Sequence, residues 1–310
     1  MIDGRKIIVS LTTIPSRMTH IYPCLMCITR QVVKADEIVL VLPKESKREP
    51  KEDGTDPYEM PKNLYDFIQK EKITIYRPDK DWGPATKLLP VLKREMDKKL
   101  PPEKENIIIT IDDDKLYDKH TIGSLVNCWK NNPNFVAGRK GGFMEFTKNK
   151  KNHPLYEQSK KFGFMCETPR RGADFTKPGL IHVIYGTGGV LYRPSFFDEE
   201  VFNYELNGAP KEAFFVDDVW ISGQLAKRNV SSLIAPSPRN KYHDKTENIR
   251  CGMMDISTSA NMVNRLFMIN IKDDCKTNVV TMQYFRGEFL KLIRNQKKER
   301  VTSKIKKYEF

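Results

Sequence analysis

The sequence lacks the features that mark several large classes of protein. No apolar run approaches the roughly 18 to 20 residues that a membrane-spanning helix needs. Residues 1–15 do not have the layout of a signal peptide, and there is no internal repeat and no Gly-x-x-x-x-Gly-Lys phosphate-binding loop. These absences argue against an integral membrane protein, a solenoid and a P-loop enzyme. We expect a soluble, cytoplasmic protein.

Cysteine and histidine are scarce, with six and five residues in 310. The cysteines do not have the spacing of a disulfide framework. Cys24 and Cys27 lie in an apolar stretch of helical character that has no second such pair and no nearby histidine partner. Two buried thiols on a core helix are therefore favoured over a zinc or redox site.

Positive charge is in excess and is concentrated at the end of the chain. The formal net charge is +13, and the last twenty residues contribute eight Lys or Arg against two Glu. The simpler interpretation is a solvated terminal helix. The alternative is peripheral contact with an anionic membrane surface. The tail has neither repeated aromatic stacking positions nor a nucleic-acid-binding motif, so nucleic acid is not expected as a partner.

Strand-like and helix-like segments alternate through the first 130 residues. This alternation predicts one α/β domain with a doubly wound, mostly parallel central sheet flanked by helices. Beyond residue 140 the pattern is mixed, and charged residues 44–62 predict a surface loop. The expected strands are 6–15, 37–43, 73–78 and 106–111, and the expected helices are 18–31, 63–71 and 120–132. Residues 81–100 are expected to open with a turn and to continue as a helix.

Three consecutive acids, Asp112, Asp113 and Asp114, follow the apolar segment 106–111. Ligands of open α/β sheets bind beyond the carboxyl ends of the strands. Carboxylates gathered there repel one another and lose solvation, so they stay ionised only beside a compensating cation. Oxygen ligands suit Mg²⁺ or Mn²⁺, which substrate phosphates also bind. The alternative is a cap for the following helix, but a cap needs only one Asp.

Five segments in order extend this signal: "VSLTTIPSR" (9–17), "DWGPATKL" (81–88), "IDDDKLY" (111–117), "YGTGGVLYRPSFF" (185–197) and "FFVDDVWIS" (214–222). Together they resemble the GT-A glycosyltransferases with a D-x-D motif. The resemblance is to the family that includes bacterial proteins and the glycan-building enzymes of large algal viruses. For a viral chain, the expected location is the host cytoplasm.

The resemblance implies a GT-A, Rossmann-like domain over residues 1–250. Residues 1–140 would bind the nucleotide sugar and 141–250 would supply the acceptor and catalytic half. Residues 251–310 would form a helical extension with the basic tail, packed on the same domain. The implied donor is a nucleoside-diphosphate sugar, UDP-sugar first and GDP-sugar second, and the acceptor is a glycan or glycoprotein hydroxyl.

The resemblance also assigns roles on the donor side. Thr12 and Thr13 would bind the base or ribose, and Asp81 would accept a hydrogen bond from the nucleoside. Arg17 and Lys87 would neutralise the charge of the phosphates, and the guanidinium group of Arg17 can donate two parallel hydrogen bonds to a phosphate. For each of these side chains the alternative is structural: strand formers for the threonines, a turn residue for Asp81 and a solvated helix residue for Arg17.

The expected metal ligands are Asp114 first, then Asp112 and His243. Asp112 and Asp113 also suit ribose or water-mediated contacts. His243 follows the last strand-like run, where the family places a histidine ligand, although a lone histidine is more often structural. Gly188, in "YGTGGV", would allow the close backbone approach that lines a sugar pocket.

Asp218, with Asp217 as second choice, is the expected base that takes the acceptor hydroxyl's proton in an inverting transfer. The family often has Glu-Asp at these positions, and a helix cap is the alternative for the other acid. Two other functions stay open: a metal-dependent nucleotidyltransferase or phosphohydrolase, and a protein that binds nucleotide sugars or carbohydrate without catalysis.

Overall fold

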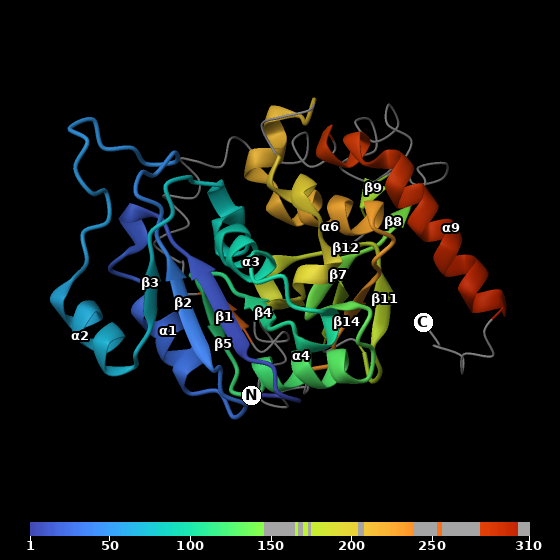
Figure 1. Cartoon of the computed structure of the whole chain (residues 1–310), viewed down its shortest axis with the longest axis horizontal. Helices are drawn as coiled ribbons and strands as arrows, with labels where there is room; N and C mark the ends of the chain where they lie inside the picture. The colour runs from blue at the N-terminus through green and yellow to red at the C-terminus, as the bar shows by residue number, and fades with distance from the viewer. Residues whose placement is uncertain are drawn as a thin grey trace.

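The computed structural model describes residues 1–145, 165–166, 170–172, 175–203, 208–237, 253–255 and 280–302 (Figure 1). His243, the expected third metal ligand, lies outside these residues. The membrane contact expected of the basic tail also falls largely outside them, since the side chains from residue 297 onward are not described.

Among the described residues, eight strands form a mixed, mostly parallel central sheet in the order β11-β14-β6-β13-β4-β1-β2-β3. Strands β1 to β4 run parallel to one another, β13 and β11 run antiparallel to their neighbours, and β14 pairs in parallel with β6. The bounds are β1 Ile7–Thr12, β2 Glu37–Val41, β3 Thr74–Tyr76, β4 Ile107–Thr110, β6 Val136–Gly138, β11 Gly179–Ile181, β13 Val190–Tyr192 and β14 Ser232–Ile234.

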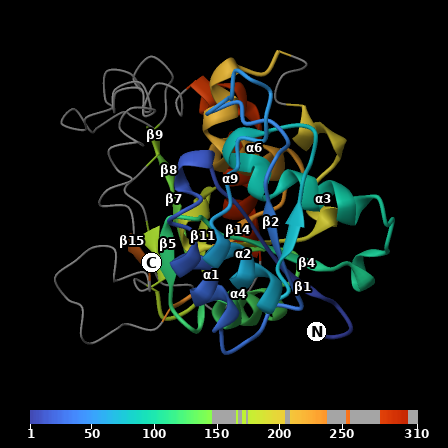
Figure 2. The same ribbon diagram turned by 90° about the vertical axis from the view of Figure 1, so that its left-hand side faces the viewer.

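Helices cover both faces of the sheet (Figure 2). Successive residues of a strand point to opposite faces, so Ile7, buried on one face, and Ile8, buried on the other, belong to different apolar clusters. One face packs against α1 (Tyr22–Thr29), α2 (Lys62–Lys70) and α4 (Thr121–Lys130). The other packs against α3 (Leu89–Met96), α6 (Asp217–Lys227) and α9 (Arg286–Thr302).

Shorter elements surround this sheet. β5 (Lys115–Tyr117) pairs with β15 (Met253–Asp255), and β8 (Met144–Glu145) pairs with β9 (Met165–Cys166). β7 (Lys140–Gly142) pairs with β10 (Arg170–Arg171) and with β12 (Val183–Ile184). The 3-10 turns are η1 Pro15–Arg17, η2 Gly83–Lys87, η3 Pro102–Lys104, η6 Gly186–Gly188, η7 Pro194–Phe196, η8 Glu199–Phe202 and η9 Lys211–Phe215.

The predicted α/β class, with its mostly parallel sheet flanked by helices, is confirmed, and all four expected strands and helices of the first half are present. The segment 81–100 opens with a 3-10 turn at Gly83–Lys87 and continues as α3, as the sequence predicts. No helix among the described residues is long and apolar enough to cross a membrane.

The C-terminal helix is part of the main core. Phe285 and Phe289 are buried in the same apolar cluster as Trp220 of α6. A side chain at Gly223 would collide with the Phe285 ring, since an added Cβ would lie 2.2 Å from it. Glycine at this position therefore allows the segment around α9 to lie directly on α6.

Candidate functional site

The topology brings the carboxyl ends of β1 and β4 to the same edge of the sheet. The chain leaves β1 toward β2 and β3 and then returns to β4 on the other side of β1. Both neighbours are parallel to β1, so the segments that follow β1 and β4 meet at one edge of the sheet. Such a change of direction is where open α/β sheets bind ligands. Here it brings Thr13 and Arg17 against the aspartates that follow β4.

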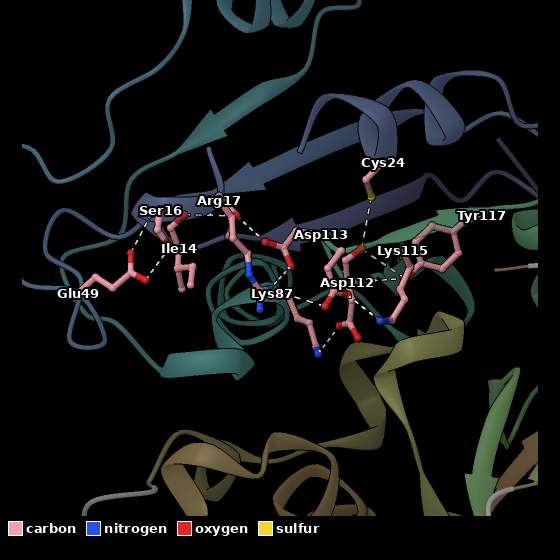
Figure 3. A network of polar contacts seen from close by, with 12 residues as sticks. Ile14, Ser16, Arg17, Cys24, Glu49, Lys87, Asp112, Asp113, Lys115 and Tyr117 are labelled. Atoms are coloured by element: carbon pink, nitrogen blue, oxygen red, sulfur yellow. Dashed lines mark hydrogen bonds and ion pairs between the residues drawn. The ribbon is translucent and has the colours of Figure 1, made fainter. Parts of the chain in front are cut away.

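Asp113 contacts both of these residues at the edge of the sheet. Its carboxylate accepts hydrogen bonds from Thr13 Oγ1 at 2.5 Å and from the Arg17 guanidinium at 2.9 Å, and its side chain is buried. Figure 3 shows Arg17 directed at Asp113. Asp113 thus ties β1 to β4, and it engages the two donors that the sequence assigned to the nucleotide.

The backbone of Asp112 is held by groups on both sides. Its N–H donates to the Tyr117 hydroxyl at 2.8 Å, and its carbonyl accepts from the Cys24 thiol at 3.3 Å (Figure 3). The carboxylate accepts from Lys87 Nζ at 2.8 Å. Burial by itself would raise the pKa of Asp112, but the charge and hydrogen bond of Lys87 outweigh it, and the pKa is lowered.

The negative charge of Asp114 is less well compensated by nearby cations than that of Asp112. Lys115 Nζ lies 3.2 Å from one carboxylate oxygen and the Arg17 guanidinium 3.8 Å from the other. Burial, followed by the charges of Asp112 and Asp113, raises the pKa of Asp114. Of the three strand-end acids it is therefore the one with most to gain from an added cation.

Lys87 joins the two halves of the chain. Its ammonium is buried and lies 2.8 Å from the carboxylate of Asp112 and 2.9 Å from that of Asp217. Asp217 is the first residue of α6. Burial would lower the pKa of Lys87, but the charges of these two acids and of Asp218 raise it well above the ordinary value. The sequence assigned Lys87 to phosphate; in the structure its charge is engaged with carboxylates.

Asp218, the second residue of α6, faces the same lysine. Its carboxylate accepts from the Gly186 backbone N–H at 2.8 Å. Burial, then the charge of Asp217, raises the pKa of Asp218 to about 8 despite the opposing charge of Lys87. A carboxyl group with a pKa this close to neutrality is suited to accept and release a proton.

In the "YGTGG" segment, Gly186 lies beside Lys87 and Asp218, and the sequence did not single it out. A Cβ there would lie 2.8 Å from Lys87 Nζ and 3.1 Å from Asp218 Oδ1. Gly188, the predicted one, packs instead against Arg139, where a Cβ would lie 2.9 Å from the Arg139 Cβ. Lys115 and Tyr117 were also missed, although both belong to the quoted "DDDKLY" segment.

Thr12 and Asp81 support the frame of the site. The Thr12 hydroxyl donates to the carbonyl of Val41 on β2 at 2.8 Å. Asp81 is buried and accepts from the Gly83 N–H at 2.7 Å, from the Thr86 hydroxyl and from the Lys47 N–H. Asp81 therefore fixes the turn that carries Lys87, and these bonds occupy it in the described structure.

Among the residues that the structure describes, the cluster has an excess of negative charge. With every carboxylate ionised, five acids face three cations and two negative charges stay uncompensated. The acids are Asp112, Asp113, Asp114, Asp217 and Asp218, and the cations are Arg17, Lys87 and Lys115. That excess equals the charge of one divalent ion, and hard oxygen donors are the ligands that Mg²⁺ and Mn²⁺ prefer.

Within the described residues, no three acidic, histidine or cysteine side chains converge in an arrangement that would hold a metal ion. Magnesium-type sites, however, commonly use only one or two carboxylates together with substrate phosphates. The donor chemistry of Asp114 and Asp112 and the charge excess therefore fit a divalent cation that binds together with a diphosphate.

Comparison of the chain with models of known protein families and with curated protein sequences yields no match. The residues of the site and their geometry therefore carry the functional argument.

We predict that Lys87→Met destabilises the protein strongly, because it leaves Asp112 and Asp217 buried without their cation. Breaking one partner out of a buried ion pair costs about 3–5 kcal/mol. Urea unfolding measures the change. The matched control is Lys93→Met, whose ammonium pairs with Asp97 at 2.6 Å on the exposed surface of α3 and should change stability little. Equal effects of the two substitutions would contradict a buried linking role for Lys87.

We predict that Asp218→Asn stabilises the protein increasingly from pH 5 to pH 8.5. Since the folded-state pKa of about 8 lies above the ordinary value of 3.8, folding retains a proton that the unfolded chain releases in this window. In the wild type, the contribution of protonated Asp218 to the free energy of unfolding is complete below about pH 4, and it is lost as the pH rises through 8. Asparagine keeps an acceptor for Gly186 without carrying the charge.

Melting temperatures in EDTA at several pH values measure this difference. One kcal/mol corresponds to about 2–4 °C in domains of 150–250 residues, so several degrees are expected at pH 8.5. The control is Asp198→Asn at the start of η8, where the acid accepts a hydrogen bond from the Glu200 N–H and lies 3.6 Å from Arg228; its replacement should not raise stability progressively with pH. A gap between wild type and Asp218→Asn that does not vary with pH would refute the assigned ionisation.

Proposed function

We propose that the chain is a metal-dependent glycosyltransferase of the GT-A type. It transfers a sugar from a nucleoside-diphosphate sugar to a hydroxyl of a glycan acceptor. UDP-sugar is the first candidate for the donor. The observation that carries the proposal is the meeting, around Lys87, of the acids that follow β4 and the acids that begin α6. One group supplies oxygen ligands at the edge where donors bind, and the other supplies a base beside it.

Asp114 and Asp112 would hold Mn²⁺ or Mg²⁺. The bound cation would offset the charge of the diphosphate and of the carboxylates around Asp218. A net charge of +13 over the whole chain favours the approach of an anionic nucleotide, even though the site itself is acidic. Arg17 and Lys115, at the rim of the acid run, are the protein cations placed to meet phosphate once Asp114 has another partner.

Asp218 has the environment of a general base. In an inverting transfer the acceptor oxygen forms a bond to the anomeric carbon, and the bond from that carbon to the β-phosphate oxygen breaks. The hydroxyl proton passes to Asp218, and the nucleoside diphosphate leaves with the bonding electrons. Gly186 N–H orients the receiving carboxylate, and Lys87 lies 2.9 Å from Asp217 beside it.

We predict that UDP and Mn²⁺ together raise the melting temperature, whereas either one alone has a much smaller effect. A ligand that binds only the folded state adds about 2.7 kcal/mol at one hundred times its dissociation constant. Asp114→Asn should remove the joint effect. The control is Asp79→Asn, an exposed acid paired with Lys44 in the loop after β3, which should keep it. No joint effect with UDP, GDP, CMP or TDP would remove the main support for a transferase.

We predict that Asp218→Asn lowers sugar transfer by about 10²–10⁴-fold, the usual contribution of a general base, while UDP still binds with Mn²⁺. The measurement is UDP release from a panel of UDP-sugars, with calorimetry for nucleotide binding. Asp217→Asn is the comparison: a larger loss of turnover there, with the fold intact, would assign the base to Asp217. Phosphate-bond cleavage without glycosyl transfer would favour a phosphohydrolase, and binding without turnover a non-catalytic protein.

A further inference from the structure

An aromatic side chain is exposed within the loop that leads into α6. The Phe215 side chain is 55% exposed, and it stands two residues before Asp217. Single exposed apolar residues are ordinary on protein surfaces. Phe215 differs from the others in the described part of the chain, such as Tyr65 on α2, because it belongs to the same segment as the proposed base.

The backbone beneath Phe215 is held firmly by the turn that carries Lys87. Phe214 packs on Gly83, which adopts a φ of +59°; an added Cβ there would lie 2.9 Å from the Phe214 carbonyl oxygen and 3.0 Å from its ring. The Lys47 ammonium lies 5.5 Å from the centre of the Phe214 ring, and the Lys47 N–H is bound to Asp81. Phe214 is therefore anchored from both sides.

Phe215 rests on this anchor and keeps its own ring in solvent. The two rings meet edge to face, with centroids 5.1 Å apart and planes at 84°. Stacking of this kind fixes ring orientation, so little side-chain freedom is left to lose when a ligand binds. The result is a preformed apolar surface at the start of α6.

The chemistry that suits such a surface is a sugar ring. A pyranose presents C–H groups on its face and hydroxyls around its edge. A single exposed ring can cover that face while the polar edge stays free for solvent and for the acids nearby. An acyl chain would need a longer apolar groove, whereas Phe215 is preceded by charged Lys211 and Glu212 on the same turn.

We propose that Phe215, supported by Phe214, is an acceptor subsite that stacks on a pyranose whose hydroxyl reaches Asp218. The acceptor is accordingly a glycan, not a lipid or a bare protein side chain. The assignment rests on the proposed function, because a subsite for an acceptor requires a transfer reaction. It adds to that reaction a binding residue and the pyranose form of the acceptor sugar.

The test compares Phe215→Ala, Phe215→Trp and Tyr65→Ala with the wild type. UDP release from a UDP-sugar is followed against increasing concentrations of a panel of p-nitrophenyl pyranosides, and donor hydrolysis without acceptor is subtracted. Phe215→Ala should raise the acceptor KM at least tenfold with a smaller change in kcat, and Phe215→Trp should restore a low KM. Tyr65→Ala removes an equally exposed aromatic, 50% accessible, from α2 and should match the wild type.

The outcomes separate the subsite from the function itself. An unchanged acceptor KM in Phe215→Ala would overturn the subsite and leave the transferase standing. UDP release that no pyranoside stimulates above donor hydrolysis would overturn the assignment of a pyranose acceptor. A wild-type protein that releases UDP from no UDP-sugar, with or without acceptor, would remove the proposed function and the subsite with it. Melting temperatures confirm that each variant is folded.

Discussion

The buried ammonium of Lys87 is the interaction on which the rest of the site depends. It is the only described cation within ion-pair distance of both the acid run after β4 and the first turn of α6. Without a positive charge there, Asp112 and Asp217 would lose the cation that they share, and leaving buried charges unpaired is strongly destabilising. Glycine at position 186 leaves room for that ammonium, because an added Cβ would lie 2.8 Å from it.

The electrostatics of the site run against those of the whole molecule. The chain is strongly basic, yet the described residues of the site include more acids than bases. Burial and neighbouring carboxylates raise the pKa of Asp114 and of Asp218. Groups whose pKa values are shifted in this way gather at functional sites, although ion-pair networks that only support the fold also produce such shifts. A divalent cation would relieve the local excess, and the distant positive charges would still draw in the anion that the cation accompanies.

Much of the fold can be predicted from sequence because its signals are local. Buried strands such as 107–110 read as continuous apolar runs, and the acids that end one of them mark the ligand edge of a parallel sheet. The partners of those acids cannot be predicted in the same way. Thr13 and Asp113 are 100 positions apart, and Lys87 meets Asp217 across 130 positions, so each pair depends on strand order and turn geometry. This is why Arg17, Lys87 and Asp81, expected to meet a nucleotide, are found bound to the protein itself.

The contacts of the three acids after β4 differ in how easily a charged ligand could replace them. Arg17 bridges Asp113 and Asp114, and Lys115 also contacts Asp114, so a cation bound to Asp114 would compete with these two side chains for its carboxylate. Asp113 stays fixed by Thr13, and Asp112 stays fixed by Lys87 and by its backbone bonds to Tyr117 and Cys24. The rigid part of the site is thus the seam between β1, β4 and α6. The part that can exchange partners is Asp114 with its two cations, where a charged ligand would enter.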